Sequence, residues 1–262
     1  MFQHYRQGLQ GFGSFSNVFS NFHVEGNVFF NNGIGADGLH RNIMFGNSNS
    51  DHVNNTFRAN YSYYPTAGGP GTNMFGGDGG CSNLTLEDNV FSHGTNRLAI
   101  ELNDCVNAQV SGNAFYGSTL PKVGGAVQSD AEFRSTFPAN EYFSDTLGAP
   151  SGIQVFVRPN RFEGGRAHIV IYNWDLSNAV DVDVSSLGLL DDDVTLRNIQ
   201  DYYGATQALA VNAGTLSVPM QGWTTAIPIG YTLGSLPATL PQFGVFVVEW
   251  DVTRSTPYRA RP

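Results

Sequence analysis

Three acidic residues in the first half of the chain, Asp78, Glu101 and Asp104, have the type and spacing for acid–base chemistry. Asp78 lies in the glycine-rich segment FGGDGGC, and the other two lie in the apolar segment NRLAIELND. If NRLAIELND is a strand, Ile100 and Leu102 face inward and Glu101 faces outward on the surface, because side chains alternate along a strand. Two carboxyl groups about 5 to 9 Å apart can hydrolyse a glycosidic bond. We predict Asp78 and Asp104 as this catalytic pair and Glu101 as the reserve partner; the alternative is that both aspartates bond turn backbone.

A second group of residues combines histidine, arginine and acid. Asp37, His40 and Arg41 lie in ADGLHRN, His52 lies in SDH, and Arg97 lies in NRLAIELND. Arginine binds a carboxylate through two hydrogen bonds, and histidine exchanges protons near neutral pH, so these residues suit a site for an acidic sugar. We predict that they bind substrate; the alternative is that they are ordinary polar surface residues.

An internal repeat indicates which elements position these residues. Two asparagines six residues apart recur four times, and phenylalanine follows the second asparagine by two places. The pairs are Asn21/Asn27, Asn49/Asn55, Asn83/Asn89 and Asn107/Asn113, and the phenylalanines are Phe29, Phe57, Phe91 and Phe115. Copy spacings of 28, 34 and 24 residues are typical of solenoid coils with loops of variable length. We therefore predict asparagine ladders at the turns and an interior stack of the four phenylalanines.

The two cysteines fit the same repeat. Cys81 and Cys105 each lie eight residues before the second asparagine of their copy, so they occupy one column in consecutive coils. Neighbouring strands lie about 5 Å apart, which is within range for a disulfide, although parallel side chains do not favour one. Two free thiols stacked in the core are the expected arrangement, and a disulfide is the alternative.

The longest insertion in the repeat, NYSYYPTAGGPGTNMFGGDGG, carries Tyr61, Tyr63 and Tyr64. Aromatic rings stack on the apolar faces of sugars, and loops commonly carry binding sites. We predict that these tyrosines contact substrate from a loop; the alternative is that they cover the edge of the solenoid. Neither the metal-ligand spacing HExxH nor a paired CxxC occurs, and no phosphate-binding glycine loop occurs, so no metal or cofactor is expected.

The second half of the chain has a different pattern. Asparagine falls from 18 in residues 1–115 to 6 afterwards, and Val180, Val182 and Val184 alternate with Asp181 and Asp183. Six apolar segments separated by turn residues predict an antiparallel β-sandwich. The predicted fold is all-β, with a parallel β-helix over residues 1–118, a linker or crossover over 119–151 and a β-sandwich over 152–262.

The net charge of −9 and the presence of a single lysine, Lys122, argue against a nucleic-acid partner, since no basic stripe exists. No segment approaches the roughly 20 apolar residues that span a membrane. The start MFQHYRQGLQ lacks the apolar centre of a signal peptide, so an exported protein would have lost its signal or carried it upstream.

The N-x-F coils resemble the right-handed parallel β-helix superfamily, which includes pectate lyases, polygalacturonases and phage tailspikes. The resemblance covers about 100 residues and specifies the fold better than the activity, since one scaffold hosts many functions. The segment RAHIVIYNWDLSNAVDVDVSSLGL and those after it look like the β-sandwich appended to many secreted bacterial carbohydrate-active proteins. The resemblance implies a secreted or cell-surface protein, a polysaccharide partner and no active site in the sandwich.

The active-site motifs of these β-helix enzymes are mostly missing, so the sequence leaves open whether the chain is an enzyme. The first interpretation is a polysaccharide hydrolase or lyase with its groove on the solenoid flank. The second is a non-catalytic carbohydrate-binding or adhesive protein, and the third is a structural part of an assembly. About four coils make a short solenoid with an open end, which a homo-oligomer would cap unless upstream coils precede it.

Overall fold

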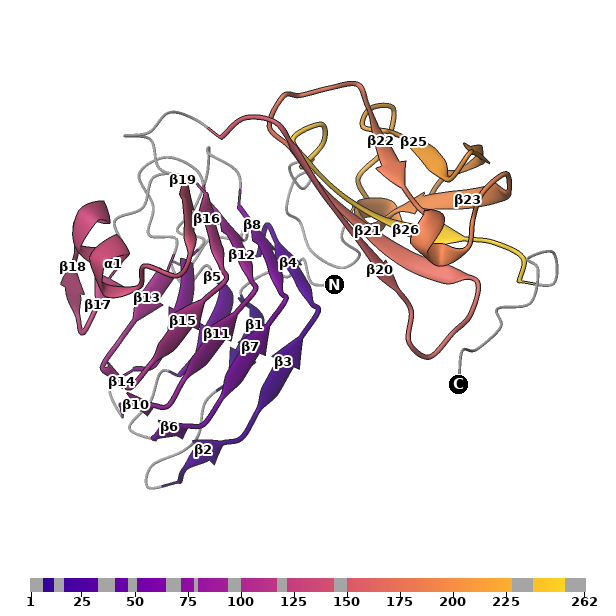
Figure 1. Ribbon diagram of the computed structural model, residues 1–262. Helices are drawn as coiled ribbons and strands as arrows, with labels where there is room; N and C mark the ends of the chain where they lie inside the picture. The colour runs from indigo at the N-terminus through magenta and orange to yellow at the C-terminus, as the bar shows by residue number, and fades with distance from the viewer. Residues whose placement is uncertain are drawn as a thin grey trace. The chain divides into compact units, whose positions relative to one another are not determined.

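The computed structural model describes residues 7–11, 17–32, 41–46, 51–64, 72–77, 80–93, 100–116, 122–143, 150–227 and 238–252. The chain divides into two compact units, residues 1–150 and 151–262. The first consists mainly of stacked parallel strands and the second of antiparallel strands (Figure 1). The predicted fold class is therefore confirmed. None of the helices in the described part of the chain is long and apolar enough to cross a membrane.

Four sheets, which we name A to D, form the first unit. Sheet A contains β4 (Val28–Phe30), β8 (Tyr61–Tyr63), β12 (Val90–Ser92), β16 (Ala114–Tyr116) and β19 (Glu141–Phe143). Sheet B contains β1 (Gln7–Gly11), β5 (Arg41–Phe45), β9 (Thr72–Phe75), β13 (Ile100–Leu102), β17 (Lys122–Val123) and β18 (Ala126–Val127). Sheet C contains β2 (Phe19–Ser20), β6 (His52–Val53), β10 (Cys81–Ser82) and β14 (Cys105–Val106). Sheet D contains β3 (His23–Glu25), β7 (Thr56–Arg58), β11 (Thr85–Glu87) and β15 (Gln109–Ser111).

Asparagine ladders run through these coils, as predicted. In the first ladder, Asn21, Asn54, Asn83 and Asn107 have φ of 61°, 56°, 52° and 58°. This left-handed conformation is one that asparagine tolerates better than most residues. The second ladder is buried for most of its length. Its members Asn27, Asn60, Asn89, Asn113 and Asn140 are joined by amide hydrogen bonds of 3.1, 3.0, 2.8 and 2.9 Å.

The predicted register of the second coil is wrong by five residues. Asn60, not Asn55, occupies the ladder, whereas Asn55 Nδ2 donates to the Phe19 carbonyl at 3.2 Å. Phe57 consequently pairs with Leu86 in sheet D, and Ser62 occupies the column of Phe29 and Phe91. The pairs Asn49/Asn55 and Asn54/Asn60 are both six residues apart. Only Asn49/Asn55 is followed two places later by phenylalanine, and this favoured the wrong alignment. Asn49 itself lies outside the described residues.

Aromatic side chains fill the interior of the first unit. Phe91 and Phe115 lie 5.4 Å apart between ring centroids, and Phe57 and Phe75 lie 4.9 Å apart. The stack continues beyond residue 118, because β19 pairs with β16 and places Tyr142 in the phenylalanine column. Residues 119–151, predicted as a linker or crossover, thus contribute β17, β18 and β19 to the first unit.

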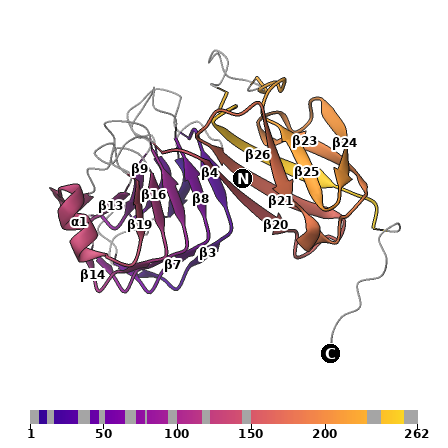
Figure 2. The ribbon, with the colours of Figure 1, turned by 45° about the horizontal axis from the view of Figure 1, so that its top comes forward.

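Helix α1 (Asp130–Thr136) lies at the C-terminal end of the coils. Ser129 and Glu132 form a capping box that begins the helix. The buried ring of Phe133 packs against Phe115 at 5.5 Å between centroids. Figure 2 shows α1 at one end of the row of strands, beyond β19, with β4 at the other end. The helix therefore covers the end of the core on that side.

The second unit is one seven-stranded antiparallel sheet folded over a shared core. Its strands are β20 (Ile153–Pro159), β21 (Arg166–Asn173), β22 (Ala179–Asp183), β23 (Asp193–Asn198), β24 (Thr206–Asn212), β25 (Thr215–Pro219) and β26 (Phe243–Glu249). Their order is β20-β21-β26-β23-β24-β25-β22. The predicted alternation in β22 is confirmed, since Val180 and Val182 are buried in the core with Ile169 and Phe246, whereas the aspartates beside them are exposed.

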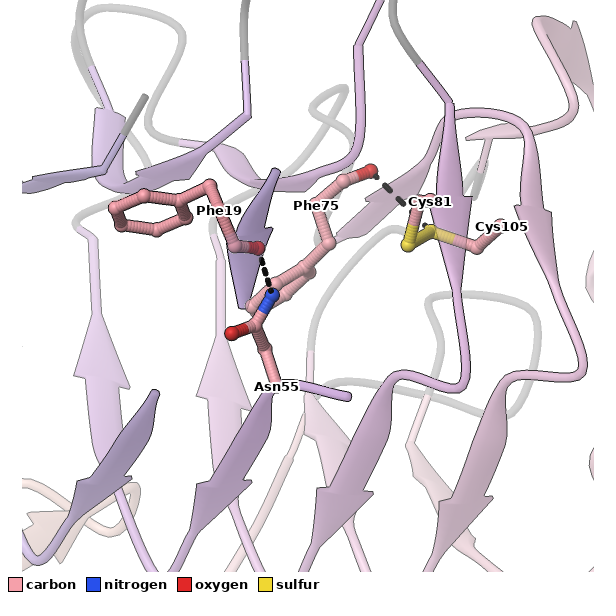
Figure 3. Close-up of a disulfide and its surroundings, with 5 residues drawn as sticks. All are labelled: Phe19, Asn55, Phe75, Cys81 and Cys105. Carbon is pink, nitrogen blue, oxygen red and sulfur yellow. Dashed lines mark hydrogen bonds between the residues drawn. A yellow bond between two sulfur atoms is a disulfide. The ribbon is translucent and has the colours of Figure 1, made fainter. Parts of the chain in front are cut away.

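The two cysteines form a disulfide (Figure 3), so the expectation of free thiols is wrong. Cys81 and Cys105 are direct partners in the register of β10 and β14, with Cα atoms 4.2 Å apart. That separation is less than the usual strand spacing of about 4.8 Å, which brings the two sulfurs within bonding reach. Cys105 Sγ also lies 3.7 Å from the Phe75 carbonyl oxygen. The bond joins two consecutive coils.

Loss of this disulfide should destabilise the first unit by about 3 kcal/mol, because the bond limits the unfolded chain across 24 residues. Urea unfolding of the native chain with and without reductant measures the change. The control is a Cys81→Ala, Cys105→Ala variant, which should match the reduced protein and should not respond to reductant. Equal stability of the oxidised and reduced native chain would contradict this role.

Candidate functional site

Sheet B brings together two of the predicted site residues, Arg41 and Glu101. Arg41 begins β5 and Glu101 is the middle residue of β13, with β9 between the two strands. Ile100 and Leu102 belong to the interior cluster, so Glu101 projects from the opposite, outer face of the sheet. Arg41 Nη1 lies 3.1 Å from Glu101 Oε1. The guanidinium therefore reaches across an intervening strand.

Glu101 is less accessible than predicted. Its outward direction is confirmed, but only 8% of the residue is exposed. Its register partners are Met74 on one side and Lys122 on the other, and Met74 in turn pairs with Met44. Both methionines are buried, so the ion pair lies in an apolar setting. Charges attract more strongly where water is partly excluded, although removing them from water has its own cost.

Asp104, one of the predicted catalytic residues, lies in the turn between β13 and β14. It is exposed and has a left-handed φ of 49°. Its backbone carbonyl accepts a hydrogen bond from the Cys81 amide at 3.3 Å. This conformation matches the alternative interpretation of Asp104 as a turn residue. Its predicted partner Asp78 lies outside the described residues.

His52 is an interior residue rather than a surface residue of the substrate site. It is buried in β6 beside Phe19 and Phe45, with ring centroids 5.4 and 6.0 Å away. Neither ring nitrogen has a hydrogen-bond partner within the described part of the chain. Burial lowers the pKa of His52, while the neighbouring Asp51 acts in the opposite direction. The neutral ring therefore fits the core, and the sequence did not reveal its inward direction.

The placement of Tyr61 and Tyr63 on a loop is wrong. Tyr61 and Tyr63 lie in strand β8, Tyr64 follows it, and all three are buried. Burial raises the pKa of Tyr63 above its ordinary range. These rings are not exposed for stacking on a sugar, and their placement agrees better with the alternative of covering the solenoid.

Four further predicted residues, Asp37, His40, Asp78 and Arg97, lie outside the described residues. In sequence they flank strands of sheet B. The first two precede β5, Asp78 follows β9, and Arg97 precedes β13.

A buried polar network, which was not predicted from the sequence, crosses the first unit. Asn42 Nδ2 donates to Ser62 Oγ at 2.8 Å, and Ser62 Oγ donates to Asn73 Oδ1 at 3.0 Å. Asn73 Nδ2 lies 3.1 Å from His93 Nε2. At the other end of this network, Asn32 Nδ2 donates to Asn42 Oδ1 at 3.0 Å. Burial lowers the pKa of His93 to about 3. In the sequence, single polar residues within otherwise apolar strands were the signal that could have indicated this network.

No group of three or more histidine, cysteine or acidic residues in the described ranges is arranged to hold a metal ion. No protein-family model matches the chain, and neither a curated protein nor a solved structure matches it.

Proposed function

We propose that the chain is a carbohydrate-active protein that binds a polysaccharide at Arg41 and Lys122, the two partly exposed cations that flank Glu101 in sheet B. The observation that carries the proposal is the contact between Arg41 and Glu101 across β9. Lys122 adds a second cation beside Glu101 in the register. An acid next to two cations on parallel strands suits a long polar ligand whose repeating units carry hydroxyl or carboxylate groups.

In the catalytic form of the proposal, Glu101 is the acid or base and Arg41 orients its carboxyl group. Hydrolysis also needs a second carboxyl group, for which Asp78 and Asp104 stay predictions. Elimination instead needs a base and a cation that neutralises the sugar carboxylate, roles that fit Glu101 and Lys122. The protein would then be a polysaccharide hydrolase or lyase of the secreted or cell-surface class.

The second candidate is a non-catalytic carbohydrate-binding protein. Glu101 is the one carboxylate on the described strands of sheet B, and Arg41 already pairs with it. Glycoside hydrolysis needs two carboxyl groups, so the lack of a second carboxylate beside Glu101 on these described strands favours binding over catalysis. The outer face would then contact the polymer through Arg41 and Lys122.

Glu101→Gln should reduce cleavage of the substrate polysaccharide by about a hundredfold or more while binding persists, since the amide keeps the shape but cannot exchange a proton. Pectin, alginate, xylan and glucan are tested for binding, for new reducing ends and for unsaturated products. The last two readouts distinguish hydrolysis from elimination.

Glu87→Gln is the matched control, because Glu87 also pairs with an arginine, Arg58, at 3.6 Å but on the exposed face of sheet D. It should leave cleavage unchanged. Circular dichroism verifies that both variants fold. Binding without cleavage by the native chain would establish the second candidate, and failure to bind or cleave any of the polymers would refute both.

A further inference from the structure

Two aromatic side chains of the second unit are almost fully exposed. Phe162, in the turn between β20 and β21, is 98% exposed, and Tyr203, which follows the short 3₁₀ helix η3 (Ile199–Asp201), is 95% exposed. In the described part of the chain, the next most exposed large apolar side chain is Ile227 at 74%. Rings that bury so little apolar area add little to the stability of the fold, so both are available to a ligand.

A cluster of polar contacts links the two exposed rings. Glu163, next to Phe162, pairs with Arg166 at 3.0 Å between Oε2 and Nη1. Arg166 also donates to the hydroxyl of Tyr202, whose ring packs edge to face against Tyr203 with centroids 5.1 Å apart. The two exposed rings therefore belong to one surface, at the end of the sheet where β21 begins and β26 ends.

Arg197 brings hydrogen-bond donors to this surface. Its Nε donates to Glu249 Oε2 at 2.9 Å, and its Cζ lies over the ring of Tyr202, 5.6 Å from the centroid. Arg166 Nη2 lies 3.3 Å from Oε1 of the same glutamate. Within the described residues, Nη1 and Nη2 of Arg197 make no hydrogen bond. The side chain is 29% exposed, so these two groups are held in place and can donate to a ligand.

The charges of the cluster cancel, because its two arginines are paired with two glutamates. A nucleic acid or a polyacidic chain requires a surplus of cations, so a balanced surface does not suit either one. Hydroxyl groups both donate and accept hydrogen bonds. They match a surface that offers the Nη groups of Arg197 as donors and the carboxylate of Glu163, 58% exposed, as an acceptor. Aromatic rings beside such groups stack on the apolar faces of sugars.

We infer that this surface of the second unit is a binding site for a polysaccharide of uncharged sugars. Tyr203 and Phe162 stack on sugar rings, Arg197 donates to hydroxyl oxygens, and Glu163 accepts from hydroxyl groups. Tyr202 holds the guanidinium of Arg197 in position through their stacked contact. The site lies wholly within the second unit, and the inference does not rest on the function proposed for sheet B.

Affinity electrophoresis of the full chain in gels that contain unsubstituted xylan or β-glucan tests the site. Tyr203→Ala removes an exposed stacking ring and should weaken binding about tenfold. Tyr203→Phe keeps the ring and should bind as the native chain does. Arg197→Lys keeps a positive charge beside Glu249 but loses the planar fork of donors, so it should also weaken binding about tenfold.

Leu190→Ala is the control, because Leu190 is a 57% exposed apolar residue that precedes β23, whereas Arg197 lies near the other end of that strand. It should leave binding unchanged, and circular dichroism should show that every variant is folded. Tyr203→Ala should not alter binding of pectin or alginate at Arg41 and Lys122, so the two sites can fail separately. A native chain that binds neither xylan nor β-glucan would overturn the inference. Equal binding by Tyr203→Ala and Leu190→Ala would do so as well.

Discussion

Phe91→Ala should lower the free energy of unfolding of the first unit by about 3 to 5 kcal/mol. Phe91 is fully buried in β12, with ring centroids of Phe115 and Phe75 at 5.4 and 6.4 Å. Its register partner in the preceding coil is Ser62, whose small side chain cannot fill the space that the ring would leave. The variant therefore loses apolar burial and retains a cavity.

Urea unfolding followed by circular dichroism measures this change. Phe162→Ala is the matched control, since Phe162 is 98% exposed and its truncation should change stability by less than about 0.5 kcal/mol. A loss of less than about 1 kcal/mol for Phe91→Ala would contradict the interior position of this column. Equal losses in both variants would do the same.

Acid should destabilise the first unit through His93. The ring is buried, and it accepts a hydrogen bond on Nε2 because the Asn73 amide nitrogen can only donate. Its pKa falls from an ordinary value of 6.5 to about 3 in the folded protein. Below pH 6.5 the unfolded chain therefore gains a proton that the folded ring does not take, so stability declines as the pH falls toward 3.

Between pH 7 and pH 4 this linkage amounts to about 3 kcal/mol, since each pH unit below the unfolded pKa contributes about 1.4 kcal/mol. His93→Gln keeps an acceptor for Asn73 but cannot be protonated, so it should remove this part of the acid sensitivity. Comparing the loss of stability over that interval in the native chain and the variant isolates His93 from other titrating groups. His23→Gln, at an exposed histidine, is the control, and an unchanged pH dependence in His93→Gln would contradict the assignment.

The fold class followed from the sequence because its signals are local. Asparagine tolerates the left-handed backbone of each coil wherever it occurs, so its spacing marks the turns without tertiary information. Alternation around Val180 and Val182 likewise records which face of one strand is buried. Register was harder, because Asn49/Asn55 and Asn54/Asn60 have equal spacing and only the packing of neighbouring coils selects one.

The candidate site depended on tertiary structure. Arg41 and Glu101 are 60 residues apart in the chain, and only the stacking of β5, β9 and β13 brings them to 3.1 Å. The sequence indicated that Glu101 points outward, since alternation is a property of one strand. The register of Glu101 beside Met74, and of Met74 beside Met44, joins three coils that lie far apart in the sequence.

The predictions for the tyrosines and the cysteines failed because they too depend on packing between coils. Alternation in a single strand cannot reveal that both faces of β8 are covered, as the burial of Tyr61, Ser62 and Tyr63 requires. The repeat in the sequence placed Cys81 and Cys105 in one column of consecutive coils. Formation of the disulfide also depends on the approach of their Cα atoms to 4.2 Å, which the spacing of residues in the sequence does not determine. The sequence alone thus determined the coil and its repeating contacts, whereas contacts between side chains of different coils decided the disulfide, the buried histidines and the Arg41–Glu101 pair, because those depend on three-dimensional packing.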